Sequence, residues 1–156
     1  MSLPQIDTAT VLRNFIDRLR RVVTDEHRAQ RRQLDAIWSK PLGERVAAGR
    51  AIEGVRVVGP TPDGGLELSC SRNTSRFREG DILCLNQGDP NFQPKLRVTI
   101  AQDQETRLRV APADFGADVL AFADGSAQWV LDEDLLDLSP LIIDALEESG
   151  DRIVGV

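Results

Sequence analysis

Arginines on predicted strands are the residues of this 156-residue chain whose type and spacing could do chemistry. Arg97, Arg107 and Arg109 occupy the polar positions of two alternating segments, so each should point away from the core. Guanidinium groups on one face can hold the phosphates of a nucleic-acid backbone. With the basic residues expected at strand ends, the candidate contacts are Arg72, Arg76, Arg78, Lys95, Arg97, Arg107 and Arg109. The alternative is a solvated face with local ion pairs to Glu67, Asp103 and Glu105.

The stretch NTSRFREGDILCL, residues 73–85, places an aromatic ring between two of these arginines and ahead of a Gly-Asp turn. We expect Phe77 to fill the end of a barrel and Gly80 to adopt a positive φ in the turn. Asp81 should accept hydrogen bonds from local amides. Arg76 and Arg78 would then remain available for phosphates.

The sequence predicts no catalytic residue, metal site or cofactor in this chain. It lacks GxxxxGK[ST], so it is not expected to be an ATPase by itself, and its single histidine, His27, gives little basis for a hydrolase. Cys70 and Cys84 lack metal or redox spacing and are interpreted as buried, unpaired thiols. The acidic run 132–137 lacks the glycine and glutamate of a calcium loop, and is interpreted as charge approaching a helix N-terminus.

The net charge of -6 hides a gradient along the chain. Basic and acidic residues number ten and six in 1–50, eight and eight in 51–112, and one and eleven in 113–156. This distribution argues against a protein that coats nucleic acid in general, but it permits a local basic surface. The sequence lacks an apolar run of membrane-spanning length and a signal-peptide pattern, so we predict a cytoplasmic protein without a membrane partner.

Hydrophobic periodicity predicts an α+β protein: a small antiparallel β-barrel flanked by a long N-terminal helix and a C-terminal helix that form a stalk. The first helix should run from Thr8, capped by Asp7 or Thr8, to about Ser39, with a short helix at 42–48 ended by Gly49. Seven strands are expected, at 52–58, 66–70, 82–85, 96–100, 107–110, 119–122 and 128–131.

The last helix should be capped by Ser139, carry Pro140 at its first helical position and stop at Gly150. Two apolar stripes without another partner should bury each other. We therefore expect Phe15, Leu19, Leu34, Ile37 and Trp38 to face, in part, Leu141, Ile142, Ala145 or Leu146. The predicted organisation is a helical stalk at 1–50, the barrel at 51–131, and at 132–156 the return helix with the start of a possible motor domain.

The order of these elements resembles the N-terminal accessory region of superfamily 1B helicases of the up-frameshift and immunoglobulin-mu-binding type. The resemblance is carried by the long charged helix, the 42–49 segment, the return helix, and a turn motif formed by Ser75, Phe77, Gly80, Asp81 and Ile82. It implies a barrel held on helical stalks beside a motor domain that grips single-stranded nucleic acid. ATP and Mg²⁺ sites would then lie in a motor beyond Val156.

The resulting hypothesis is a nucleic-acid-binding or regulatory accessory module of an ATP-dependent DNA or RNA helicase. Its contacts would be to the backbone and independent of base sequence, and its motor would be downstream or a separate chain. The alternative is a free-standing protein-interaction or adaptor barrel that makes no contact with nucleic acid.

Overall fold

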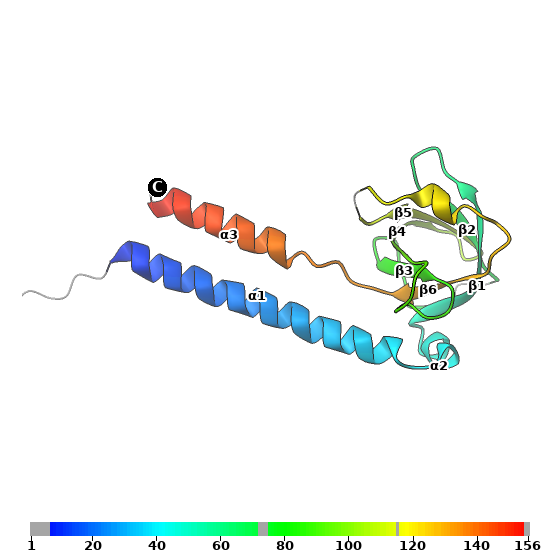
Figure 1. Ribbon diagram of the computed structural model, residues 1–156, viewed down its shortest axis with the longest axis horizontal. Helices are drawn as coiled ribbons and strands as arrows, with labels where there is room; N and C mark the ends of the chain where they lie inside the picture. The colour runs from blue at the N-terminus through cyan, green and yellow to red at the C-terminus, as the bar shows by residue number, and fades with distance from the viewer. Residues whose placement is uncertain (1–6, 72–74, 115, 155–156) are drawn as a thin grey trace, which may run out of the picture. The chain divides into compact units, whose positions relative to one another are not determined.

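The computed structural model describes residues 7–71, 75–114 and 116–154 of the chain. It confirms the predicted fold class, because the chain forms a closed antiparallel barrel whose strands lie, in sequence, between a long N-terminal helix and a C-terminal helix (Figure 1). The chain divides into two compact units: Gln33–Leu136, which holds the barrel, and Met1–Arg32 with Asp137–Val156, which holds the helix pair. None of the described helices is long and apolar enough to cross a bilayer.

Six strands close the barrel in the order β1-β2-β5-β4-β3-β6, and all neighbouring strands are antiparallel. Closure pairs β1 with β6 and leaves neither strand as a free edge. Their bounds are β1 Ala51–Pro60, β2 Leu66–Ser69, β3 Ile82–Asn86, β4 Leu96–Asp103, β5 Arg107–Pro112 and β6 Trp129–Glu133.

The barrel core is built from alternate residues of every strand, as the period of two in the sequence predicts. Its least exposed members include Val55, Leu68, Leu83, Leu85, Val98, Leu108 and Leu131. Cys70 and Cys84 are both buried and unpaired, which confirms their interpretation as small core residues. Burial raises the pKa of the Cys84 thiol to about 12, so it stays protonated at neutral pH.

The predicted strand at 119–122 is wrong, so six of the seven expected strands are found. Residues Val119–Phe122 form a 3₁₀ helix, η1, whose Val119 and Phe122 pack against the barrel core. The Phe122 and Trp129 rings lie 5.4 Å apart between centroids. A four-residue apolar run carries no periodicity that separates a strand from a helical turn. Because β6 already pairs with both β1 and β3, the closed barrel has no edge at which another strand could add.

A buried ion pair joins the helix before the barrel to its last strand. Arg45, on α2 (Leu42–Ala47), is 4% exposed, and its Nε donates to Asp132 Oδ1 on β6 at 2.8 Å. The same guanidinium donates to the carbonyls of Lys40 and Gly88 at 2.6 and 2.7 Å. Asn86 donates to the other carboxylate oxygen of Asp132 at 2.8 Å, so this fully buried carboxylate is satisfied on both sides.

The end of α1 (Thr8–Trp38) packs on the barrel. Leu34 and Trp38 form a small buried cluster with Cys84 and Leu135, and the Trp38 indole donates to the Glu133 carbonyl at 2.8 Å. The expectation that Leu34 and Trp38 face the C-terminal helix is therefore wrong. The helical period identified their buried stripe, but it could not identify the surface that covers it.

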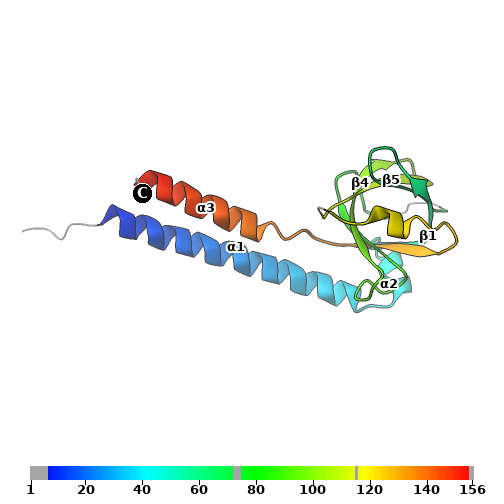
Figure 2. The same ribbon diagram turned by 45° about the horizontal axis from the view of Figure 1, so that its top comes forward.

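In the other unit, the first part of α1 and α3 (Ser139–Val154) run antiparallel and side by side, as Figures 1 and 2 show. Arg13 pairs with Asp151 at 3.6 Å, Arg20 pairs with Glu147, and His27 lies 3.5 Å from Asp137. Gly150 does not end α3. A Cβ atom at Gly150 would lie 2.3 Å from Cδ1 of Ile16, so the missing side chain lets the two helices approach closely.

Two further expectations for the helix pair change. Ile16 is buried, whereas Phe15, Leu141 and Ile142 are exposed, so the apolar residues predicted to meet between the helices in part point elsewhere. Asp7 caps α1 by accepting from the Ala9 amide at 3.1 Å, as one of the two predicted candidates. At α3 the acceptor is Asp137, which bonds the amide and the hydroxyl of Ser139, so Ser139 donates where it was expected to accept.

We predict that Asp132→Ala lowers the free energy of unfolding by about 3–5 kcal/mol, because it leaves the buried Arg45 guanidinium without its counter-ion. The matched control is Asp114→Ala, which removes a half-exposed carboxylate from Arg97 and should cost less than about 1 kcal/mol. Urea unfolding followed by tryptophan fluorescence measures both. Equal losses in the two variants would contradict the assigned role of the buried pair.

Candidate nucleic-acid interface on the barrel

Arg97 points outward from β4, as its alternation predicts, but its charge is already matched. Its Nε lies 3.2 Å from Asp134 Oδ2 and its Nη1 lies 3.2 Å from Asp114 Oδ1. Burial acts to lower the pKa of Arg97, but the two carboxylates outweigh it and raise that pKa above its ordinary value. A phosphate at Arg97 would have to compete with these two carboxylates, so Arg97 is the weakest member of the predicted set.

Arg107 and Arg109 also point outward, on β5, and both are exposed. Arg107 lies 3.4 Å from Glu67 Oε1, a long pair with the Arg107 side chain 53% exposed. Arg109 stands opposite Glu67 in the β2–β5 register and forms no ion pair within the described residues. Asp63 is also near Arg109: a hydrogen bond from Thr61 and, to a smaller extent, the charge of Arg109 lower the pKa of the Asp63 carboxyl. Two carboxylates, Glu67 and Asp63, therefore stand near these two exposed guanidinium groups.

A third arginine of the same surface, Arg56, was missed by the sequence analysis. It is exposed on β1 opposite Ser69, and Ser69 is in turn opposite Arg107 on β5. Neighbouring strands are about 4.8 Å apart, so Arg56 and Arg107 have Cα atoms roughly 10 Å apart across β2. We name Arg56, Arg107 and Arg109 the β1–β2–β5 arginine row. The available signal was the alternation Val55-Arg56-Val57, which puts Arg56 outside between two buried valines.

Two other predicted contacts, Lys95 and Arg78, make local contacts of their own. Lys95 Nζ lies 5.7 Å from the Trp38 ring centroid and donates to the Pro90 carbonyl at 3.3 Å, so it takes part in local structure. Arg78 is exposed, and its Nη1 donates to the Phe77 carbonyl at 2.8 Å. Arg72 lies outside the described residues.

The segment around Phe77 is arranged as the sequence analysis expected. Phe77 is 4% exposed and belongs to the barrel core, and Gly80 has φ +92°. Asp81 Oδ2 accepts from the Arg78 amide at 2.9 Å. These three residues therefore have structural roles in the turn that leads into β3. Their contacts give no sign of a ligand-binding role.

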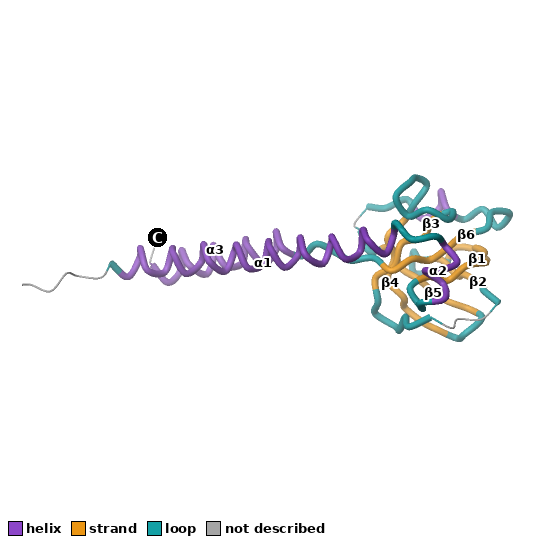
Figure 3. The backbone as a smooth tube through the Cα atoms, turned by 90° about the horizontal axis from the view of Figure 1, so that it is seen from below, coloured by secondary structure: helices purple, strands orange, loops and turns teal. Residues whose placement is uncertain are grey.

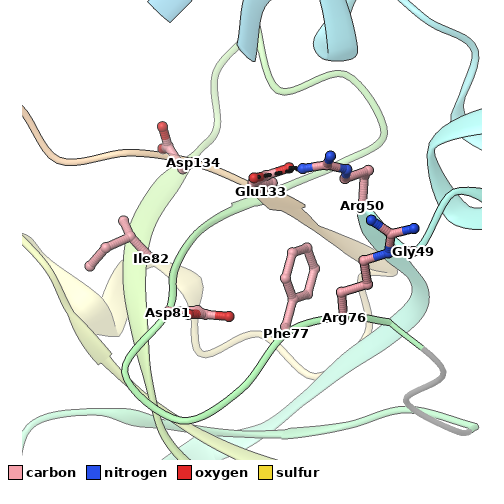
Figure 4. Close-up of a pocket in the computed structure, with 8 residues that line it drawn as sticks. All are labelled: Gly49, Arg50, Arg76, Phe77, Asp81, Ile82, Glu133 and Asp134. Atoms are coloured by element: carbon pink, nitrogen blue, oxygen red, sulfur yellow. Dashed lines mark hydrogen bonds and ion pairs between the residues drawn. The ribbon is translucent and has the colours of Figure 1, made fainter. Parts of the chain in front are cut away.

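Arg76 lines a cavity of about 190 Å³ beside this segment (Figure 4). The Arg76 amide donates to the Gly49 carbonyl at 3.1 Å, and its side chain lies against Gly49, where a Cβ would be 3.1 Å from Arg76 Cγ. Gly49 also has φ +74°, so glycine is favoured there for two reasons. The Arg76 guanidinium has no ion pair within the described residues, and Arg50 lines the same cavity.

The cavity is of mixed charge. Arg50 donates to both carboxylate oxygens of Glu133, at 3.0 and 2.7 Å, and the walls also carry Asp81 and Asp134. The three acidic residues balance the nearby arginines, so this cavity lacks the excess of positive charge that would concentrate phosphate. The arginine row is the stronger candidate for a backbone contact.

The described residues include no cluster of three or more His, Cys, Asp or Glu side chains placed to hold a metal ion. No protein-family model matches the chain, and no curated protein matches it in sequence.

We predict that Phe77→Ala destabilises the fold and that Arg76→Ala does not, because only Phe77 is part of the core. Phe77→Ala should cost about 3–5 kcal/mol of unfolding free energy, because it leaves a cavity in the barrel core. Arg76→Ala should change that free energy by less than about 0.5 kcal/mol, since its guanidinium is exposed. Urea unfolding of both variants is the measurement. A loss at Arg76 equal to that at Phe77 would assign Arg76 to the fold.

Proposed function

We propose that this chain is a nucleic-acid-binding accessory module of an ATP-dependent helicase or translocase. The observation that supports it best is the β1–β2–β5 arginine row: three exposed guanidinium groups on adjacent strands, with Glu67 as the carboxylate in contact. Each arginine has several N–H donors, and the described contacts do not fix any of them in an orientation suited to a particular base edge. The row therefore suits the phosphates of a single strand and not the edges of particular bases.

The rest of the proposal concerns the motor. A closed barrel carried between two long helical elements has the element order of the accessory region that the sequence resembles. In this proposal the chain supplies backbone contact or regulation in the cytoplasm. ATP and Mg²⁺ act in a motor domain that is downstream or a separate chain.

The second candidate is a protein-interaction or adaptor module that makes no contact with nucleic acid. It is favoured by the helix pair, which exposes large apolar side chains at Val11, Phe15, Val22, Leu141 and Ile142. Exposed apolar groups that gather on one element mark protein contacts more often than nucleic-acid contacts. The two candidates differ in one measurable respect, which is binding to a bare oligonucleotide.

We predict weak, salt-dependent and sequence-tolerant binding of labelled single strands, measured by fluorescence anisotropy at several salt concentrations. The double variant Arg56→Ala with Arg109→Ala should weaken binding equally for different base sequences. It should also reduce the slope of log affinity against log salt by about 1.4, since each phosphate contact on a single strand contributes roughly 0.7.

Arg97→Ala is the matched control, because this arginine is on the same barrel but already holds two carboxylates. It should leave the salt slope nearly unchanged. The absence of binding at every salt concentration by a folded chain would refute direct contact and favour the adaptor. A variant that altered base preference would refute contact through phosphates alone.

A further inference from the structure

The cavity beside Phe77 lies inside the barrel unit, where the first residues of β1 and β3 meet the end of β6. Figure 3 shows these strands from another side. The cavity has a volume of about 190 Å³, and five of its eight lining residues are charged. The contacts that each charged group makes within the protein decide which of them a ligand could use.

Three of the five charges are already matched. Arg50 Nη1 donates to both carboxylate oxygens of Glu133, at 3.0 and 2.7 Å. Asp134 accepts from the Leu135 amide at 2.8 Å with Oδ1 and from Arg97 Nε at 3.2 Å with Oδ2. The Asp134 side chain is also only 3% exposed. A ligand would gain little from these groups, because each already has a partner of opposite charge.

Arg76 has a packed stem and an unpaired charge. Its Cγ and Cδ atoms lie against Gly49, where a Cβ would be 3.1 and 3.7 Å from them, and its amide donates to the Gly49 carbonyl. This packing restricts the Arg76 side chain before a ligand arrives, which lowers the entropic cost of a contact. The guanidinium forms no ion pair with any residue that the structure describes. Its N–H donors therefore remain open to a ligand.

Asp81 supplies the other open charge. Its role in the turn uses only Oδ2, which accepts from the Arg78 amide at 2.9 Å. The residue is exposed, and its Oδ1 accepts no hydrogen bond from the described parts of the chain. Figure 4 shows Arg76 and Asp81 on the two sides of Phe77, and they form no ion pair with each other. The cavity thus holds one cation and one carboxylate oxygen that the fold leaves unmatched.

These two open groups define the class of ligand. A phosphate or a simple carboxylate would satisfy Arg76, but it would meet three carboxylates of the lining, whereas an amine would satisfy Asp81 but meet two arginines. A zwitterion satisfies both groups and leaves the net charge of the cavity unchanged. The volume is below the roughly 300–1,000 Å³ of pockets for drug-sized ligands, so the ligand must be small.

We propose that this cavity binds a small zwitterion with the chemistry of an amino acid, its carboxylate on Arg76 and its ammonium on Asp81. Phe77 and Ile82 supply the apolar part of the wall. Such a ligand has few atoms to bury, so its dissociation constant should be about 1 mM. This inference goes beyond the proposed function and does not depend on it, because the β1–β2–β5 arginine row is formed by other residues.

Amide NMR of the full, ¹⁵N-labelled chain tests the site. The probes are glycine, β-alanine and γ-aminobutyrate, which hold the two charges at increasing separation, with acetate and methylammonium as single-charge controls. One member of the series should bind most tightly and shift the amides of residues 76–82, because both of its ends must reach partners at fixed positions. Acetate and methylammonium should bind at least about tenfold more weakly.

Two variants assign the charges. Arg76→Gln should abolish the preference for the zwitterion over methylammonium. Asp81→Asn should abolish the preference over acetate, while the asparagine oxygen still accepts from the Arg78 amide. The matched control is Arg78→Gln, because Arg78 is exposed in the same segment but does not line the cavity, so the titration should not change. Urea unfolding verifies that each variant is folded.

Three results would overturn the proposal. The first is the absence of amide shifts with every zwitterion at about 50 mM. The second is binding of acetate or methylammonium as tight as that of the best zwitterion, which would leave one of the two charges without a role. The third is a titration that Arg76→Gln does not alter.

Discussion

The buried pair of Arg45 and Asp132 is the constraint on which the barrel unit depends. It ties α2, where the chain enters the barrel, to β6, where the chain leaves it. The guanidinium also bonds the carbonyls of Lys40 and Gly88, so the helix connection and the β3–β4 loop converge on the same group. Two buried charges gain little stability from attraction alone, because each loses its hydration. Their value here is positional, since few other arrangements would satisfy all of these donors and acceptors.

The surroundings of the cavity follow from that junction. Beside the pair, the Glu133 amide donates to the Arg50 carbonyl at 3.1 Å, and the Arg50 guanidinium returns to the Glu133 carboxylate. The strands β1 and β6 are therefore fixed to each other where the barrel closes. Gly49 precedes Arg50, and its carbonyl accepts a hydrogen bond from the Arg76 amide. This bond positions the segment that leads Phe77 into the core. The local motif at Phe77 depends on a distant junction that a short sequence pattern does not contain.

Much of the fold could be read from the sequence because it is encoded locally. Alternation and short apolar runs between turns found all six strands, and the Gly-Asp turn gave the roles of Phe77, Gly80 and Asp81 correctly. The errors occur where a residue's role depends on a contact with a residue that is distant in sequence. Gly150 is a residue type that often ends a helix, but here the absence of a side chain lets α3 approach Ile16 of α1 closely. No local pattern reports whether a glycine is used for backbone freedom or for close packing.

The candidate interface shows the same division. Alternation gives the direction of an arginine but not its partner, so Arg97 and Arg109 looked equivalent in sequence. Arg97 meets Asp134 and Asp114, which follow β6 and β5 and approach β4 through the pairing of strands in the barrel. Arg56 was overlooked although its alternation with buried valines is as clear as that of Arg109.

Charge in this chain therefore acts through arrangement more than through its total. A net charge of -6 disfavours binding to phosphates over the molecule as a whole, but local fields are set by neighbours within about 8 Å, the screening length at physiological salt. On the barrel, Arg56 and Arg109 form no ion pair among the described residues, although Arg109 stands opposite Glu67 and near Asp63, so its field is only partly cancelled. On the helix pair, opposite charges are divided between α1 and α3, so the same acidic total gives attraction between helices. Two carboxylates of the C-terminal acidic excess, Glu147 and Asp151, are thus neutralised locally by arginines of α1.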